Sequence, residues 1–245
     1  MLPINEIYTC VQGEGPLTGI PHILIRFVGC PLRCQFKDSF CDTSNNSWKP
    51  EKGQYDWGDI FKIIQDNPKI HHIMITGGSP TMHPLVLQEL CQYLYGKNKI
   101  VTIESEGSRF VKLGELVKLS LSPKLTNSIP KVGSTNPYTG QVVSQKHVQL
   151  HEKERYNLEV LKQWMTRNQD YWFKFVVSSP EDLEEIREKY IKPLHIHYSK
   201  VFLMPEGVTQ EHLSNTQWII EECIKEGYNY TDRLHVRIYG DRRGV

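Results

Sequence analysis

Short apolar runs rich in β-branched residues recur along the chain and alternate with longer amphipathic stretches. Seven apolar runs are typical of buried strands, at residues 22–28, 73–76, 100–104, 118–121, 173–177, 201–204 and 234–239. The amphipathic stretches predict helices near residues 57–66, 83–96, 111–117, 152–168, 180–191 and 209–226. Because strands and helices alternate, the pattern indicates βα units that build a parallel sheet.

The number of strands limits the choice of architecture. A complete eight-unit barrel typically needs about 250 residues without long excursions, so an α/β fold with an incomplete (β/α) barrel of about six parallel strands fits 245 residues better. We find no internal repeat, low-complexity tract or linker, and therefore predict one domain over residues 1–245. The segment near residues 125–150 has weak periodicity and is predicted to be an excursion or a lid. Functional residues are expected on the loops that follow the strands.

Composition narrows the class of protein. The chain has 29 Lys and Arg against 28 Asp and Glu, a formal net charge of +1, and so lacks the basic surplus expected of direct nucleic-acid binding. No apolar run approaches the roughly 20 residues that a bilayer span needs, and the mean hydropathy is −0.45. The first residues lack the basic and apolar regions of a secretory signal. We therefore expect a cytoplasmic protein without membrane association.

Three of the six cysteines, Cys30, Cys34 and Cys41, crowd into twelve positions directly after the first strong strand, with the spacing C-x3-C-x6-C. Without an export signal, a disulfide framework is the poorer interpretation. A structural zinc site usually takes four ligands in two close pairs. Three thiolates leave one iron of a 4Fe-4S cube open to a small molecule, which favours an iron–sulfur site. Zinc, or thiols that merely pack, remain the alternatives.

The cysteine loop resembles the radical S-adenosylmethionine (SAM) superfamily. The usual motif there is C-x3-C-x2-C after the first barrel strand, with a large residue before the third cysteine. Cys30, Cys34 and the pair Phe40-Cys41 match in order, position and flanking residue, although the second gap is four residues longer. Growth of a surface loop costs only about 0.6 kcal/mol per doubling of its length, so the extra residues can be looped out. The resemblance implies a 4Fe-4S cluster and SAM.

The N-terminal run over residues 6–21 narrows the resemblance. It looks like the Q-G-E-G-x-x-x-G-x-P opening of the 7-carboxy-7-deazaguanine synthase family. The match continues through residues 25–30, 41–43, 75–78, 122–124, 174–177, 204–207 and 233–245. Each motif alone is modest, but their order and spacing along nearly the whole chain are specific.

This resemblance implies a radical SAM lyase. Members of the family convert 6-carboxy-5,6,7,8-tetrahydropterin to 7-carboxy-7-deazaguanine with loss of ammonia, on the way to preQ0, queuosine and related bases. A 5'-deoxyadenosyl radical takes hydrogen from C6 of the pterin, and SAM is regenerated. The family also implies Mg2+, an electron donor such as flavodoxin or ferredoxin, and a homodimer. A different radical SAM activity, such as a glycyl-radical activase, and a non-catalytic protein with a structural metal remain the rival hypotheses.

The resemblance assigns substrate binding to Val11, Gln12, Gly13, Glu14, Arg26 and Thr76. Gln12 and Glu14 offer an amide and a carboxylate to the donor and acceptor edge of a pterin; a polar N-terminal turn is the alternative. Arg26 lies in an apolar strand, where a charge is costly unless it is paired. Its guanidinium suits the substrate's 6-carboxylate, and an internal salt bridge is the alternative.

Cofactor binding is assigned by the same resemblance to Phe40, Asp42, Gly78, Ser79, Ser122, Pro123, Lys124, Met204, Pro205 and Glu206. Ser79 replaces the glutamate of the superfamily's G-G-E-P motif, which holds the SAM amino group, so another acid such as Glu104 or Glu106 is a candidate. Residues 122–124 are implied beside the SAM carboxylate and ribose, and residues 204–206 beside the adenine or ribose. Bare strand-to-helix turns are the alternative for residues 77–80 and 204–207.

Four residues are implied as metal ligands: Cys30, Cys34 and Cys41 for the cluster, and Thr43 for Mg2+. Magnesium keeps most of its waters and takes few protein oxygens, so one hydroxyl suffices. The alternative is that Asp42 and Thr43 cap the helix that follows. The other cysteines, Cys10, Cys91 and Cys223, are predicted to be core thiols.

Overall fold

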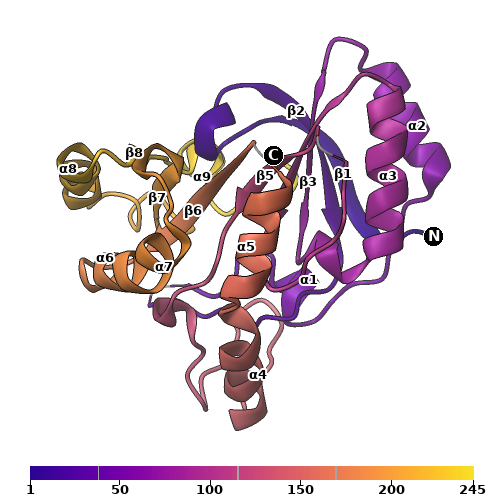
Figure 1. Cartoon of the computed structure of the whole chain (residues 1–245). Coiled ribbons are helices and arrows are strands. Elements are labelled where there is room, and N and C mark those ends of the chain that lie inside the picture. The colour runs from indigo at the N-terminus through magenta and orange to yellow at the C-terminus, as the bar shows by residue number, and fades with distance from the viewer. Residues whose placement is uncertain (38, 115, 169) are drawn as a thin grey trace.

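The computed structural model describes residues 1–37, 39–114, 116–168 and 170–245. Its framework is one eight-stranded sheet whose strand order follows the sequence, from β1 to β8 (Figure 1). The strands are β1 Ile4–Val11, β2 Pro21–Phe27, β3 His72–Gly77, β4 Ile100–Ser105, β5 Lys118–Leu121, β6 Tyr171–Val177, β7 Val201–Pro205 and β8 Asn229–Tyr230.

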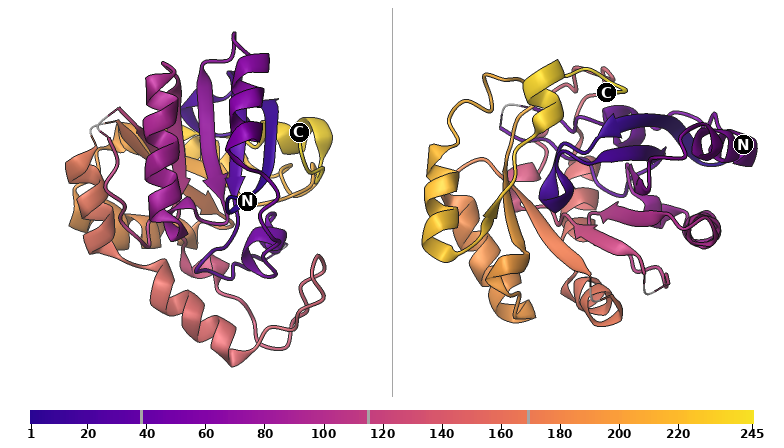
Figure 2. Two further views of the ribbon diagram at one scale, coloured as in Figure 1. Left: turned by 90° about the vertical axis from the view of Figure 1, so that its right-hand side faces the viewer. Right: turned by 90° about the horizontal axis from the view of Figure 1, so that it is seen from above.

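The strand pairing confirms the predicted fold class. Strands β1 and β2 pair antiparallel, and every later pair from β2 to β8 is parallel. Six longer parallel strands, β2 to β7, therefore form the open barrel, and the helices lie on its outer side (Figure 2). The carboxyl ends of parallel strands meet at one edge, which is where the loops with the motif residues gather.

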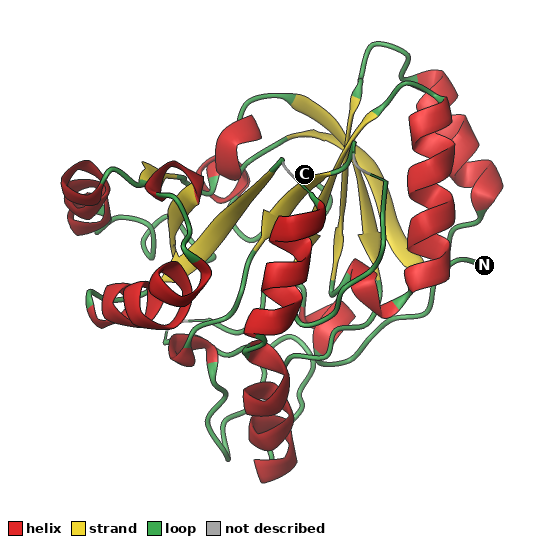
Figure 3. Ribbon diagram, viewed as in Figure 1, coloured by secondary structure: helices red, strands yellow, loops and turns green. Residues whose placement is uncertain are grey.

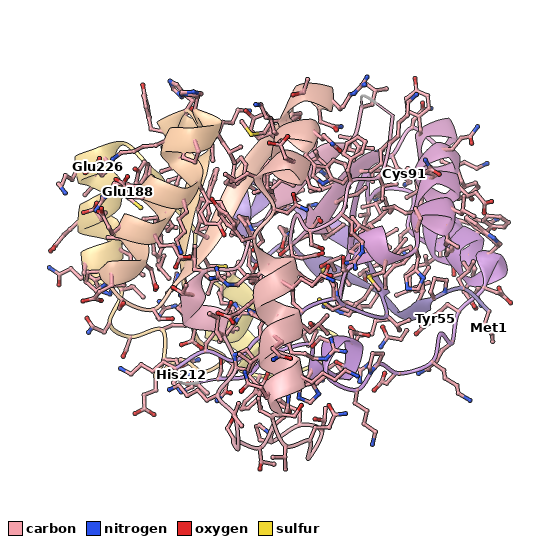
Figure 4. The ribbon with its side chains drawn as sticks, turned by 60° about the horizontal axis from the view of Figure 1, so that its bottom comes forward. Met1, Tyr55, Cys91, Glu188, His212 and Glu226 are labelled. Atoms are coloured by element: carbon pink, nitrogen blue, oxygen red, sulfur yellow. The ribbon has the colours of Figure 1, made fainter. Side chains whose placement is uncertain are left out.

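Apolar runs form these strands because both faces of the central strands are covered. Ile25, Ile75 and Ile103 stand in register on three neighbouring strands and are fully buried. Burial of each such side chain contributes about 1.5–3 kcal/mol. The core extends under α3 to Cys91, which lies among the packed side chains (Figure 4). Burial raises the pKa of the Cys91 thiol to about 12, and Cys223 is buried in the same core, as predicted for both. The same prediction is wrong for Cys10, which is only half-buried and lines a cavity.

The helices are α1 Ser44–Ser47, α2 Trp57–Asp66, α3 Pro84–Gly96, α4 Gln145–Arg155, α5 Leu158–Arg167, α6 Glu181–Ile186, α7 Lys192–Leu194, α8 Gln217–Glu226 and α9 Leu234–Tyr239. Helices α2, α3 and α5 cover the outer face of the sheet, whereas α4 lies below it (Figure 3). Helix α9 begins beside the N-terminal loop, where the Leu234 N–H donates to the Gly13 carbonyl. The predictions for α2 and α3 are confirmed. Helix α2 begins with a capping box, in which Asp56 and Asp59 accept each other's backbone N–H groups. None of the helices in the described ranges is both long and apolar enough to cross a membrane.

Several predicted elements are wrong. Residues 234–239 form α9 rather than a strand: only Val236 is buried, and the Arg237 N–H bonds to the Arg233 carbonyl one turn back. A six-residue run with apolar residues at every second position does not distinguish the two structures when few of its side chains are buried. Strand β1 was not predicted, because Asn5, Glu6 and Thr9 interrupt the continuous apolar run that identified the other strands. The two-residue β8 was also missed.

Other helix boundaries also differ from the predictions. The described part of residues 111–117 is not helical, and Gly114 interrupts it. The stretch 152–168 divides into α4 and α5, because Asn157 caps α5 by accepting a bond from the Val160 N–H. The last predicted helix begins only at Gln217.

The stretch predicted as an excursion carries a short 3-10 turn at Thr126–Ser128, an isolated bridge between Thr135 and Val142, and the start of α4. It extends below the sheet in Figure 1. Its inner side contacts the cysteine loop.

Candidate active site

The three clustered cysteines follow β2 and line one cavity at the carboxyl edge of the sheet, here named the thiol cavity. The longer second gap is taken up by a small hairpin. The Cys41 N–H donates to the Cys34 carbonyl at 3.2 Å, and Gln35 and Phe40 form an antiparallel bridge. The hairpin therefore brings the second and third cysteines side by side despite the six intervening residues.

The hairpin is attached to its surroundings at several points. The Trp48 indole donates to the Cys34 carbonyl at 3.2 Å, and the Phe40 ring packs edge-on against Trp48. Gln35 Oε1 accepts from the Ser134 hydroxyl and from a backbone N–H of the excursion, each at 2.8 Å. The excursion thus supports the cysteine loop from below.

Burial dominates the electrostatics of the thiol cavity. It raises the pKa of Cys30 and of Cys34, and the charges of neighbouring cysteines and of Glu106 add to the effect. A bound cation would reverse this, because the thiolate is the form that binds metal. Within the described part of the chain, no group of three or more His, Cys, Asp or Glu side chains is arranged to hold a single metal ion.

The end of β3 contributes backbone atoms rather than side chains to the wall of the thiol cavity. A Cβ on Gly78 would lie 2.2 Å from the Gly29 carbonyl oxygen and 2.8 Å from that of Asn46, so only glycine fits this close approach. Gly78 lines the thiol cavity. Ser79 is fully buried and its hydroxyl bonds with that of Thr81 at 2.9 Å.

Two charged side chains follow β4 and β5. Lys124 lines the thiol cavity, and its Nζ donates to the carbonyl of Ser122 at 2.6 Å and to its hydroxyl at 2.9 Å. Glu106 lines the same cavity and accepts a 2.5 Å bond from Ser108. A cation and an anion therefore share one cavity with the three thiols.

A buried charge cluster joins the N-terminal loop to β4 and β6. Lys174, with 2% of its side chain exposed, pairs with Glu14 and, at 2.6 Å, with Glu104. Glu14 also accepts from Arg233 Nε at 3.1 Å. Burial opposes ionisation of Glu14, but the two cations outweigh it and hold the pKa of this carboxyl well below its usual range. Glu14 is therefore an anion at any physiological pH.

Arg233 connects three loops. It pairs with Glu14 from the N-terminal loop and with Asp42 from the cysteine loop, and donates to the Gly207 carbonyl after β7. Burial raises and Arg233 lowers the pKa of Asp42, with a net decrease. Sequence reasoning gave Arg233 no role beyond its place in the C-terminal match.

Thr43 occupies the N-cap position of α1, but its side chain makes no capping hydrogen bond. Its hydroxyl lies 3.4 Å from Cys41 Sγ instead, and Asp42 is engaged by Arg233. The alternative that these two side chains cap the helix is therefore wrong. Thr43 lines the thiol cavity and the cavity beside the N-terminal loop.

Arg26 and Gln12 both have partners within the chain. Arg26 Nε donates to Glu6 at 2.7 Å, the internal salt bridge named as its alternative role, and its Nη2 lies 3.4 Å from the Tyr8 hydroxyl. Gln12 Oε1 accepts from the backbone N–H groups of Gly13 and Glu14 and so shapes the loop. Both side chains still line the cavity beside the N-terminal loop.

The structure groups most of the predicted residues around three adjoining cavities. The cavity beside the N-terminal loop, here the loop cavity, is lined by all six residues expected at the substrate: Val11, Gln12, Gly13, Glu14, Arg26 and Thr76. A third cavity, here the β7 cavity, is lined by Phe40, Asp42, Ser122, Lys124, Met204, Pro205 and Glu206. Pro123 and Ser79 line none of the three cavities.

Further lining residues were missed by sequence reasoning. Tyr8, Arg233 and His235 line the loop cavity, and Lys174 lines the β7 cavity. Lys174 could have been found as a single charge within an apolar strand, the pattern that singled out Arg26. Tyr8 belongs to β1, which was itself not predicted.

Comparison with known proteins identifies the family. No family model matches the chain. The 7-carboxy-7-deazaguanine synthase of Rhodopirellula baltica is 35% identical over 246 residues, covering 100% of this chain and 89% of that protein. The chain belongs to the 7-carboxy-7-deazaguanine synthase family. The synthase of Halobacterium salinarum is 31% identical, with 98% of this chain and 91% of that protein covered.

The fold of this family member agrees with a solved structure. QueE from Escherichia coli superposes with a TM-score of 0.62 at 24% identity, covering 96% of this chain and 94% of that one. The likeness supports the open α/β barrel. The sequence relatives confirm the family that the motifs indicated.

Proposed function

We propose that this chain is a radical SAM lyase that converts 6-carboxy-5,6,7,8-tetrahydropterin to 7-carboxy-7-deazaguanine with loss of ammonia, in 7-deazapurine biosynthesis of the preQ0 and queuosine type. One observation carries the proposal. The loop cavity, with its six expected substrate residues, adjoins the thiol cavity, and both share Asp42, Thr43, Thr76, Gly77 and Glu104 as walls. A substrate in the first cavity would lie beside a cofactor in the second.

The residues present suit a 4Fe-4S cluster and SAM. Three free thiols line one cavity, and Gly78 brings backbone close to it. When bound, the cluster supplies the electron that cleaves SAM and so starts the radical reaction. The β7 cavity shares Cys34, Cys41 and Lys124 with the thiol cavity and is the proposed site of the nucleoside part. Thr43, with no capping bond, is the proposed protein ligand of Mg2+.

The chain's own contribution is placement. Glu14 is held ionised by Lys174 and Arg233 and accepts hydrogen bonds from the N–H edge of the pterin. Arg26 keeps part of its guanidinium on the loop cavity while its Nε pairs with Glu6, which fits a second contact to the 6-carboxylate. Fixed partners on both residues limit their reorganisation when substrate binds.

The oligomeric state, the cellular location and the electron donor are proposed from the same family resemblance. We expect a single-domain enzyme that acts as a homodimer in the cytoplasm and receives its electron from a flavodoxin- or ferredoxin-type donor. The continuous sheet from β1 to β8 supports one functional unit. The substrate is a small molecule, and no nucleic acid takes part in the reaction.

The test is anaerobic reconstitution with iron and sulfide, then reaction with SAM, a reductant, Mg2+ and the carboxytetrahydropterin, with mass spectrometry of the product. We expect 7-carboxy-7-deazaguanine from the parent protein and none from Cys41→Ala. The matched control is Cys223→Ala, which removes a buried thiol of α8.

Two other outcomes of this experiment would each favour one of the rival hypotheses. If 5'-deoxyadenosine forms without the deazaguanine, the chain has a different radical SAM activity. A colourless protein that binds zinc in place of iron and sulfide would make it a non-catalytic relative.

A further inference from the structure

Glu106, directly after β4, has one buried oxygen without a partner. The residue is 7% exposed, and its Oε1 accepts the 2.5 Å bond from Ser108. Its Oε2 is buried and finds no hydrogen-bond donor among the described residues. A buried acceptor left unsatisfied costs about 1–3 kcal/mol, and more when it is charged. The position therefore suits a ligand that brings a donor, best of all a cation.

The location of this carboxylate indicates which ligand. Glu106 lines the thiol cavity, and its charge raises the pKa of both Cys30 and Cys34, so it lies close to the proposed cluster ligands. Lys124, at the end of the next strand, lines the same cavity with an ammonium group. One carboxylate and one ammonium on the same small cavity match the two ends of an α-amino acid zwitterion.

Of the two other candidate residues, one is already paired with a cation and the other lies outside the cavities. Glu104 is bound to Lys174 at 2.6 Å and takes part in the buried charge cluster. The Ser79 hydroxyl bonds with Thr81 and lies outside the three cavities. Among these acids and this serine, only Glu106 combines burial, the cavity and a free acceptor atom.

We propose that Glu106 binds the α-ammonium group of the methionine part of SAM, with Lys124 facing its carboxylate. This inference rests on the proposed function. The turn after β3 carries Ser79 in place of the glutamate that holds the SAM amino group in the superfamily, and Glu106 would make that contact instead. The charge is supplied from the end of β4 rather than from the end of β3.

Nucleoside binding to the reconstituted protein tests this assignment, with two probes that differ in the amino acid. S-adenosylhomocysteine carries the amino acid, and 5'-methylthioadenosine lacks it. Glu106→Gln keeps the size of the side chain and the Ser108 contact but loses the charge. We expect it to weaken S-adenosylhomocysteine binding about 10- to 100-fold, as for loss of a charge-assisted bond, and to change methylthioadenosine binding less than about 2-fold. Glu188→Gln, on the exposed helical surface (Figure 4), is the matched control.

Stability of the free protein supplies the second measurement. Glu106→Gln replaces a buried carboxylate oxygen, for which the described residues offer no donor, by a neutral amide group. Because an uncompensated buried charge costs more than a neutral polar group, we expect the urea midpoint of the variant to equal or exceed that of the parent. A lowered midpoint together with equal losses for both nucleosides would mean that Glu106 is structural and would overturn the inference. Unchanged binding of S-adenosylhomocysteine would also overturn it while the proposed function stands. If the parent binds neither nucleoside, the proposed function itself fails.

Discussion

The Ser39 hydroxyl donates a hydrogen bond to the Glu206 carboxylate, which joins the hairpin in the cysteine loop to the loop after β7. The two residues are 167 positions apart in the sequence. Ser39 belongs to the residues that lengthen the gap between Cys34 and Cys41. The additional residues between Cys34 and Cys41 are therefore not simply looped out into solvent. Through Ser39 they contact a wall of the β7 cavity, which is the proposed nucleoside site.

We expect Ser39→Ala to weaken SAM binding about 3- to 10-fold, because the loss of a bond to a carboxylate loosens one wall of the cavity. Isothermal titration of the reconstituted protein measures the affinity. Iron content should not change, since the Cys34–Cys41 backbone bond is independent of Ser39. Ser214→Ala, which removes a bond within an exposed turn, is the control. Equal affinities in both variants would show that the contact is incidental.

The sheet could be predicted from sequence because its central strands are buried on both faces and so are apolar throughout. Strand β1 could not, since it pairs along one edge and carries polar residues such as Asn5 and Glu6. Helix α9 could not be predicted either. Its single buried residue, Val236, gives no periodic pattern of buried positions that would distinguish a helix from a strand.

The site was predictable where one loop carries several functional residues. The three cysteines and the N-terminal motif are of this kind. Contacts between distant segments were not: Lys174 and Arg233 reach Glu14 over 160 and 219 positions. Their pairing depends on how the sheet closes, which no local pattern encodes. The free oxygen of Glu106 is likewise visible only once its neighbours are in place.

Gly78 should not tolerate a side chain. The Cβ in Gly78→Ala would collide with two backbone carbonyls, which cannot move as a flexible side chain can. We expect a loss of about 3 kcal/mol in the free energy of unfolding, measured by urea denaturation. Gly96→Ala is the control, because its Cβ at the end of α3 would meet no atom of the described residues within 4 Å. It should stabilise the fold by about 0.5–1 kcal/mol. Similar changes in the two variants would contradict the close approach.

Lys174 should be essential for stability as well as for the site. Lys174→Met leaves the carboxylates of Glu14 and Glu104 facing each other without their shared cation. We expect a loss of about 3–5 kcal/mol, as for a broken buried ion pair, in urea unfolding of the metal-free protein. Adding Glu104→Gln to Lys174→Met should restore part of it. Lys162→Met, at an exposed position of α5, should change stability by less than about 0.5 kcal/mol.

His151 should make the support of the cysteine loop sensitive to acid. It is fully buried on α4, where Nδ1 accepts from the Arg33 N–H at 3.1 Å and Nε2 lies 3.0 Å from the Ser128 hydroxyl. Burial lowers its pKa to about 3, and the charges of Arg155, Lys124 and Arg33 contribute. Protonation would place a second donor against the Arg33 N–H.

The direction in which the free energy of unfolding changes with pH follows from this lowered pKa. Because the unfolded histidine protonates near its usual value of 6.5 and the folded one near 3, the stabilisation is complete above 6.5 and is lost as the pH falls toward 3. Between pH 7 and pH 5 the loss from this residue is about 2 kcal/mol. His22 and His72 also have lowered pKa values, so the parent must be compared with His151→Gln. Urea unfolding of the metal-free proteins at both pH values should show a smaller pH dependence in the variant by that amount. An equal pH dependence would mean that His151 is protonated in the folded protein and that its bond to the cysteine loop does not require the neutral ring.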